Sequence, residues 1–377
     1  MNSIDELEKQ IKSKSKDIYT DSYSMSVGEI ASMYDDGEII LQPDYQRFFR
    51  WTNSQKTRFI ESLFLGIPIP PIFIYQQEDG VWAVIDGLQR LSTILQFMGK
   101  LRDDHNQDHN VSELSLESTR FLPALKGKTF DGASGISSKL KLFFKRAKLD
   151  LKIIGHNNDP DTQYELFQRL NTGGTNLSYQ EVRNAIILME DREAFHKMEL
   201  LSKNEDFINT LPLSQKQLDE KNNLEFIVRY FIYRFNIKKE LDAKGNEDIK
   251  PYLTQEIINI LRTEDIDWDY EEKIFSNVFK EINNALGENA FKKYNNESKK
   301  FQGPVMLKQY EAIVPGLINR VIFLRNEEQD IQFNNLSEKI IQLSLDENFI
   351  NKKEQHRPII RMKELLLYSI SYFDGYY

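Results

Sequence analysis

The spacing of apolar residues changes abruptly after Ile85, and this change limits the folds open to the chain. Two short runs before it, Ile72–Gln76 and Val81–Ile85, show the alternation of β-strands. After it, apolar residues recur every three to four positions from Leu88 to Met98, which is the period of a helix. The sequence therefore predicts a strand that leads through Asp86-Gly87 directly into a helix.

The residues before these strands predict two more helices. Thr52-Asn53-Ser54 offers an N-cap for an apolar stripe that Gly66 ends. The following Ile67-Pro68-Ile69-Pro70-Pro71 cannot be helical, because proline lacks an amide donor and holds the residue before it extended. Residues 25–40 predict another helix that leads into an extended segment. Residues 102–138 are polar and in places rich in Gly and Ser, which favours an insertion or mobile loop.

Beyond residue 190 the periodic segments are helical, as in Leu224–Phe235 and Leu336–Leu343, and no strand alternation persists. We therefore predict the α+β class, with a mixed domain over residues 1–190 and an all-helical domain over residues 191–377. A chain of 377 residues is long enough for two such domains.

Composition excludes several kinds of protein. Cysteine is absent, which removes disulfides, thiolate metal sites and cysteine nucleophiles. The net charge of -9 argues against coating of duplex DNA by bulk charge, although a local basic site remains possible. No apolar run approaches the length of a membrane span, and the N-terminus lacks a secretory leader, so a cytoplasmic protein is expected.

The strongest chemical signal is Ile85-Asp86-Gly87-Leu88-Gln89-Arg90-Leu91-Ser92-Thr93. A strand delivers an acidic residue and a glycine to a helix start, where unpaired amides favour an anion such as phosphate. Asp86 could hold a metal ion or a ribose hydroxyl, Gln89 could orient a water molecule, and Arg90 could donate to phosphate. The structural alternative is that Asp86 is only an N-cap and Arg90 a surface residue.

A second cluster interleaves cations with rings: Tyr45, Gln46, Arg47, Arg50 and Trp51. This combination grips phosphates and stacks on bases. The alternative is a loop whose aromatic residues fix it to the core.

A third cluster, Phe167-Gln168-Arg169-Leu170-Asn171-Thr172-Gly173-Gly174-Thr175, exposes backbone amides beside Asn171 and Thr172, which could reach a bound polyanion. A helix C-cap followed by a turn explains the same residues without a ligand.

Together these blocks resemble the N-terminal domain family of GmrSD-type, modification-dependent restriction enzymes, within the ParB/sulfiredoxin-like superfamily. The resemblance covers roughly residues 25–190 and includes Pro43–Arg47, Ile60–Leu63, Ile67–Pro71, Ile85–Leu91 and Phe167–Thr175 in order. It implies a ParB/sulfiredoxin-like N-terminal domain. The sulfiredoxin branch needs a cysteine at the helix start and is closed to this chain.

The resemblance implies that Asp86, Gln89 and Arg90 bind and hydrolyse a nucleoside triphosphate with Mg²⁺, Asp86 holding the metal ion. GTP, ATP and CTP are not distinguished. We expect Gly87, Ser92, Thr93, Asn171 and Thr172 to contact the nucleotide. The resemblance associates Tyr45, Gln46 and Arg47 with sensing DNA, and we extend this role to Arg50 and Trp51.

Members of the family often carry a C-terminal His-Asn-His nuclease domain, and the sequence gives no sign of one here. Of the five histidines only His356 lies in the last 180 residues. His105 and His109 have metal-ligand spacing, but a solvated loop explains them as well. If DNA is cut, we expect a separate nuclease subunit to cut it.

Three functions follow from the sequence. The first is an NTP-hydrolysing sensor subunit of a modification-dependent restriction or anti-phage defence system. The second is a non-catalytic module that recognises DNA, modified or not. The third is a scaffold whose helical half mediates assembly, as a homo-oligomer or with other proteins.

Overall fold

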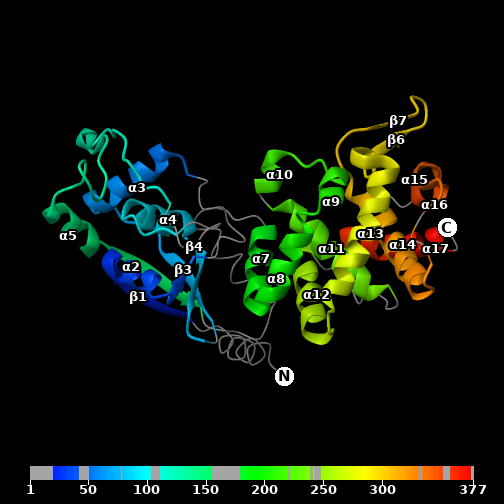
Figure 1. The fold of residues 1–377 in the computed structure, drawn as a ribbon, viewed down its shortest axis with the longest axis horizontal. Helices are drawn as coiled ribbons and strands as arrows, with labels where there is room; N and C mark the ends of the chain where they lie inside the picture. The colour runs from blue at the N-terminus through cyan, green and yellow to red at the C-terminus, as the bar shows by residue number, and fades with distance from the viewer. Residues whose placement is uncertain are drawn as a thin grey trace, which may run out of the picture. The chain divides into compact units, whose positions relative to one another are not determined.

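A computed structural model describes residues 20–41, 51–77, 79–102, 111–154, 179–219, 221–237, 241, 248–329, 331, 333–350 and 357–374. The chain divides into two compact units, residues 1–176 and 177–377 (Figure 1). The predicted border at residue 190 falls after helix α7 (Tyr179–Glu190), whereas α7 packs against helices α8, α11 and α12 of the second unit. Its buried side chains Val182, Ala185 and Ile186 give the reason for this difference.

A five-stranded sheet with the order β1-β5-β3-β4-β2 forms the first unit's framework. The strands are β1 (Thr20–Ser26), β2 (Ile39–Ile40), β3 (Ile72–Gln76), β4 (Trp82–Asp86) and β5 (Lys148–Ile154). The pairs β1–β5 and β3–β4 are antiparallel, and the pairs β3–β5 and β2–β4 are parallel. The two strands predicted at Ile72–Gln76 and Val81–Ile85 are confirmed as β3 and β4.

In the part of the first unit that the structure describes, the helices that accompany this sheet are α2 (Val27–Asp35), α3 (Asn53–Leu65), α4 (Leu88–Phe97) and α5 (Ser138–Arg146), with a short 3₁₀ turn η2 (Pro123–Leu125). The predicted start of α3 is confirmed, because Thr52 and Gln55 form a capping box. Its predicted end is confirmed as well. Gly66 has a φ of 67°, a left-handed conformation that favours glycine.

Residues 102–138 were predicted to be an insertion or mobile loop, and the mobile loop is wrong for residues 111–137, which pack onto the core of the first unit. The side chains of Leu114, Leu116 and Phe130 are buried there. Helix α3 also holds this segment through polar contacts, since Glu61 Oε1 accepts a hydrogen bond from the Leu122 amide at 3.0 Å. These apolar residues are spaced irregularly, so a search for periodicity does not find them.

The second unit is helical, as predicted. Its helices are α7 (Tyr179–Glu190), α8 (Arg192–Leu201), α9 (Glu205–Thr210), α10 (Gln215–Asp219), α11 (Asn222–Asn236), α12 (Ile249–Thr263), α13 (Trp268–Leu286), α14 (Leu307–Asn326), α15 (Leu336–Leu345), α16 (Glu347–Ile350) and α17 (Pro358–Phe373), with a 3₁₀ turn η3 (Gly287–Asn289). A short hairpin, β6 (Lys293–Asn295) and β7 (Lys300–Gln302), was not predicted. Three residues per strand are too few for an alternation to show.

The core of the second unit contains a buried cluster of charges. Glu311, which is fully buried, accepts hydrogen bonds from Arg229 at 3.1 Å and from Arg361 at 2.8 Å. Glu225 also accepts from Arg229, at 2.8 Å. These two carboxylates raise the pKa of Arg229 despite its burial. The arginine is therefore a permanent cation that fixes α11 against α14.

Helices α14 and α17 approach so closely at Gly316 that no side chain fits between them. A Cβ atom at residue 316 would lie 2.4 Å from the carbonyl oxygen of Ser369. The Gly316 amide donates to Ser369 Oγ at 2.8 Å.

Among the described helices of the whole chain, none is both long and apolar enough to cross a bilayer.

Candidate functional site

The junction of β4 and α4 forms a corner at Asp86-Gly87, as the sequence predicts. Gly87 is the N-cap of α4 and has a φ of 99°, and as a glycine it offers no side chain to cap the helix. Helix starts favour an anion in general, because their first amides have no partner within the helix itself. A Cβ atom at Gly87 would lie 2.9 Å from Cγ1 of Ile72. Both the backbone angle and the space therefore favour glycine at this position.

Asp86 and Arg90 form an ion pair along the first turn of α4. Arg90 Nη2 donates to Asp86 Oδ2 at 2.8 Å, and their side chains are 7% and 18% exposed. Arg90 Nη1 donates to the carbonyl oxygen of Pro71 at 3.1 Å and also to that of Pro70. Burial lowers the pKa of Arg90, and the Asp86 carboxylate partly offsets this. Because the Asp86 side chain is 18% exposed and that of Arg90 only 7%, the carboxylate is the more accessible group of the pair.

This arrangement gives Arg90 a task that the sequence analysis missed. Residues 67–71 form neither helix nor strand, so the carbonyl groups of Pro70 and Pro71 need hydrogen-bond donors from elsewhere. Arg90 donates these hydrogen bonds and thereby links residues 67–71 to the Asp86-Gly87 corner. Direct contact of Arg90 with phosphate stays a prediction, because Nη1 and Nη2 face groups of the chain itself.

Gln89 and Trp51 meet at the same end of α4. Gln89 Oε1 accepts a hydrogen bond from the Trp51 amide at 3.3 Å. The Trp51 ring packs edge-on against Phe59, with 5.5 Å between ring centroids. The structure thus brings Trp51 to the corner, but its ring contacts the core, which agrees with the structural alternative for this residue.

The other residues predicted to sense DNA, Tyr45, Gln46, Arg47 and Arg50, lie outside the described residues. Their described neighbours are Leu41, which follows β2, and Trp51. Strand β2 runs parallel to β4, so both strands point toward the end of the sheet where Asp86 lies. The chain therefore leaves Leu41 toward that end and returns to it at Trp51.

Two further predicted contacts receive no support from the geometry. Ser92 and Thr93 are buried, and their hydroxyl groups donate to the Gln89 carbonyl at 3.3 and 2.6 Å. Asn171 and Thr172 lie outside the described residues. The last described residue before them, Ile154, pairs with Tyr75, whereas Asp86 pairs with Phe73 at the other end of β3.

A buried lysine at the other end of α4 was also missed. Lys56 is 4% exposed, and its Nζ donates to Gln96 Oε1 at 2.8 Å. Burial lowers the pKa of Lys56 to about 8. Gln89 and Gln96 are seven residues apart, so they share one face of α4. This spacing was the signal in the sequence that could have predicted polar contacts between α3 and α4.

The donors at the corner suit a magnesium ion that keeps most of its water. Among the described residues there is no group of three or more His, Cys, Asp or Glu side chains that could enclose a metal ion. Mg²⁺ is commonly held by one or two carboxylates together with phosphate oxygens and water. The partly exposed Asp86 fits this requirement.

Residues 27–188 match the family model of the GmrSD restriction endonuclease, N-terminal domain. The match includes β2, β3, β4 and α4, and it also includes α7 of the second unit. Comparisons with curated proteins and with solved structures found no match.

Proposed function

We propose that this chain, whose residues 27–188 match the GmrSD N-terminal domain family, binds and hydrolyses a nucleoside triphosphate such as GTP, ATP or CTP. It would act as the sensor subunit of a modification-dependent restriction or defence system, together with a separate nuclease. The observation that carries this proposal is the Asp86-Gly87 corner, where a partly exposed carboxylate adjoins the glycine at which helix α4 begins.

Each group at the corner has a distinct task in the proposal. The first amides of α4 would donate to phosphate oxygens, and the glycine at residue 87 allows the left-handed turn that leads from β4 into this helix. Asp86 would hold Mg²⁺, which supplies neutralisation of charge on the phosphates when bound. Arg90 acts as a positioning residue, because its hydrogen bond fixes the orientation of the Asp86 carboxylate.

Gln89 connects hydrolysis with sensing. Its side chain accepts from the Trp51 amide, at the end of the segment that holds Tyr45, Gln46 and Arg47. A change at Trp51 therefore acts on the first turn of α4, where Gln89 would orient the attacking water. In this proposal DNA binds to the residue 45–51 segment and alters turnover through Gln89.

One observation favours the second candidate function, a DNA-binding module without turnover. Arg90 Nη1 and Nη2 are engaged with Pro70, Pro71 and Asp86. Phosphoryl transfer is stabilised by cationic donors aimed at the reacting phosphate, and Arg90 is not aimed there in this arrangement. In this second function the corner holds a backbone phosphate of DNA.

The experiment that tests the proposal measures phosphate release from GTP, ATP and CTP with Mg²⁺, using the full chain and the variant Asp86→Asn. Asparagine keeps an acceptor for Arg90 but loses the charge that holds the metal ion. We expect turnover to fall by about 100-fold or more. Asp150→Asn, an exposed position on β5, serves as the matched control and retains turnover.

Two outcomes contradict the hydrolytic proposal. Equal turnover of the full chain and Asp86→Asn removes Asp86 from the mechanism. Absence of turnover with every nucleotide, together with DNA binding that weakens steeply with salt, establishes the second function instead.

A further inference from the structure

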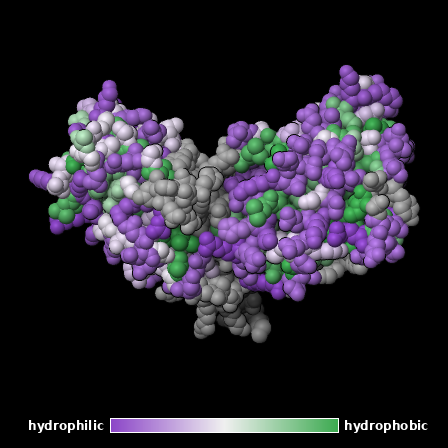
Figure 2. Space-filling view, in the orientation of Figure 1, coloured by the Kyte–Doolittle hydropathy of each residue, from purple (hydrophilic) through white to green (hydrophobic). Residues whose placement is uncertain are grey.

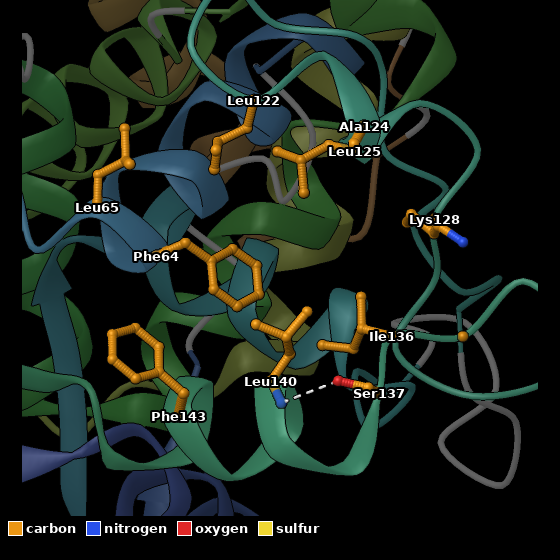
Figure 3. A pocket seen from close by; sticks show the side chains of 11 residues that line it. Phe64, Leu65, Leu122, Ala124, Leu125, Lys128, Ile136, Ser137, Leu140 and Phe143 are labelled. Atoms are coloured by element: carbon orange, nitrogen blue, oxygen red, sulfur yellow. Dashed lines mark hydrogen bonds between the residues drawn. The ribbon is translucent and has the colours of Figure 1, made fainter.

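An apolar groove opens on the first unit between the C-terminal end of α3 and helix α5. We call it the α3–α5 groove, and it has a volume of about 540 Å³. Its lining includes Phe64, Leu122, Leu125, Ile136, Leu140 and Phe143. Figure 3 shows these side chains pointing toward one another, whereas the amine of Lys128 points away at the rim.

Large apolar side chains are exposed along this groove. Leu140 and Phe143 of α5 are 44% and 53% exposed, and Leu65 of α3 is 43% exposed. Most of the surface seen in Figure 2 is hydrophilic, and one of its hydrophobic groups lies at the edge of the first unit where Figure 1 places α5. Contiguous exposed apolar surface of this kind marks interaction sites.

The surroundings of the groove carry positive charge. Residues 111–154 contain nine Lys and Arg against four Asp and Glu, a net charge of +5 in a chain whose net charge is -9. Lys128 lies in the lining, and Lys139, next to the lining residue Leu140, is exposed on α5. Asp131, one of the few acidic residues nearby, is paired with Lys141. The rim is therefore cationic and the floor apolar.

We propose that the α3–α5 groove binds an amphipathic helix with an acidic polar face, presented by a partner protein. An apolar stripe fills such a groove while flanking carboxylates meet the lysines of its rim. DNA fits less well, because it offers no apolar stripe to cover Leu140 and Phe143. The proposal does not depend on nucleotide hydrolysis, since the groove lies at the end of α3 opposite Trp51 and the Asp86-Gly87 corner.

The test uses two synthetic helical peptides of about 18 residues, five helical turns, with the same leucine stripe. One carries Glu on its polar face and the other carries Lys. Binding to the full chain is measured by fluorescence anisotropy at several salt concentrations. We expect the affinity of the Glu peptide to exceed that of the Lys peptide by about ten-fold or more. This difference in affinity should become smaller as the salt concentration rises.

A matched pair of variants locates the binding. Leu140→Ser removes a lining side chain, whereas Leu142→Ser changes a leucine of the same helix that is 49% exposed and is not among the lining residues. We expect Leu140→Ser to weaken the Glu peptide about ten-fold and Leu142→Ser to leave it unchanged. Lys128→Glu weakens the Glu peptide and strengthens the Lys peptide.

Each of the remaining outcomes overturns the proposal. Three results would show that the groove does not bind an acidic helix. They are equal affinity for the two peptides, no binding of either peptide, and equal effects of Leu140→Ser and Leu142→Ser. Dimerisation of the chain that Leu140→Ser abolishes, measured by light scattering, assigns the groove to a second copy. Duplex DNA that binds less tightly to Lys128→Glu but equally to Leu140→Ser assigns the rim to DNA.

Discussion

Replacing Arg90 with alanine separates its structural task from a chemical one. The change removes the ion pair with Asp86 and the donors to the carbonyl groups of Pro70 and Pro71. Loss of one partner from a buried ion pair costs about 3–5 kcal/mol, and the 18% exposure of the Asp86 side chain lets water recover part of that. We therefore expect the free energy of unfolding of the first unit to fall by about 3 kcal/mol.

Urea denaturation followed by tryptophan fluorescence measures this loss, because Trp51 and Trp82 lie in the first unit and Trp268 in the second. Arg58→Ala is the control, since Arg58 is an exposed arginine of α3, and we expect a change within about 0.5 kcal/mol. Arg90→Lys gives a loss between the two, because an ammonium cannot reproduce the fork of the guanidinium.

Equal stability of Arg90→Ala and Arg58→Ala would refute the reasoning. It would show that the guanidinium does not hold the corner and is available to a ligand. Loss of hydrolysis in Arg90→Ala, by contrast, cannot by itself make Arg90 a catalytic residue, because the same change is expected to loosen Asp86. The Asp86→Asn comparison is therefore the sharper test of the chemistry.

Three further changes have predictable effects. In Gly316→Ala, the new methyl group meets the Ser369 carbonyl, so thermal denaturation should show a loss of about 1–3 kcal/mol, more than the gain of about 1 kcal/mol from helix propensity. Glu311→Gln removes a negative charge that offsets the buried positive charge of Arg229, so urea denaturation should show the free energy of unfolding falling by about 3–5 kcal/mol. The pKa of Lys56, about 8 when folded and 10.5 in its ordinary state, means that the unfolded chain binds this proton more tightly. Stability relative to Lys56→Met should therefore rise between pH 8 and 10.5 by about 3 kcal/mol, and a flat difference across this range would contradict the burial argument.

The local structure around the corner could be predicted because short-range signals determine it. The change of period after Ile85 marks the passage from β4 to α4, and Gly66 marks the end of α3. The buried face of α2, formed by Val27, Ile30, Ala31 and Tyr34, also follows from helical spacing alone. In each case the residues that decide the structure lie within one or two turns of one another.

The partners of Arg90 could not be predicted, because Pro70 and Pro71 lie about twenty residues earlier and come close only in the folded sheet. Strand β1 was missed for a similar reason. Its sequence, TDSYSMS, has few apolar residues, and it is a strand because it pairs with β5 more than a hundred residues later. Packing also decides the unit border, since α7 has the same helical period whichever core it joins.

The position of α7 has a practical consequence for cutting the chain. The family model ends at residue 188, but α7 buries Val182 and Ile186 among the helices of the second unit. A fragment made from residues 27–188 would expose this apolar stripe to water, where it invites aggregation. Ending the fragment at residue 176 leaves α7 with the helices that shield it.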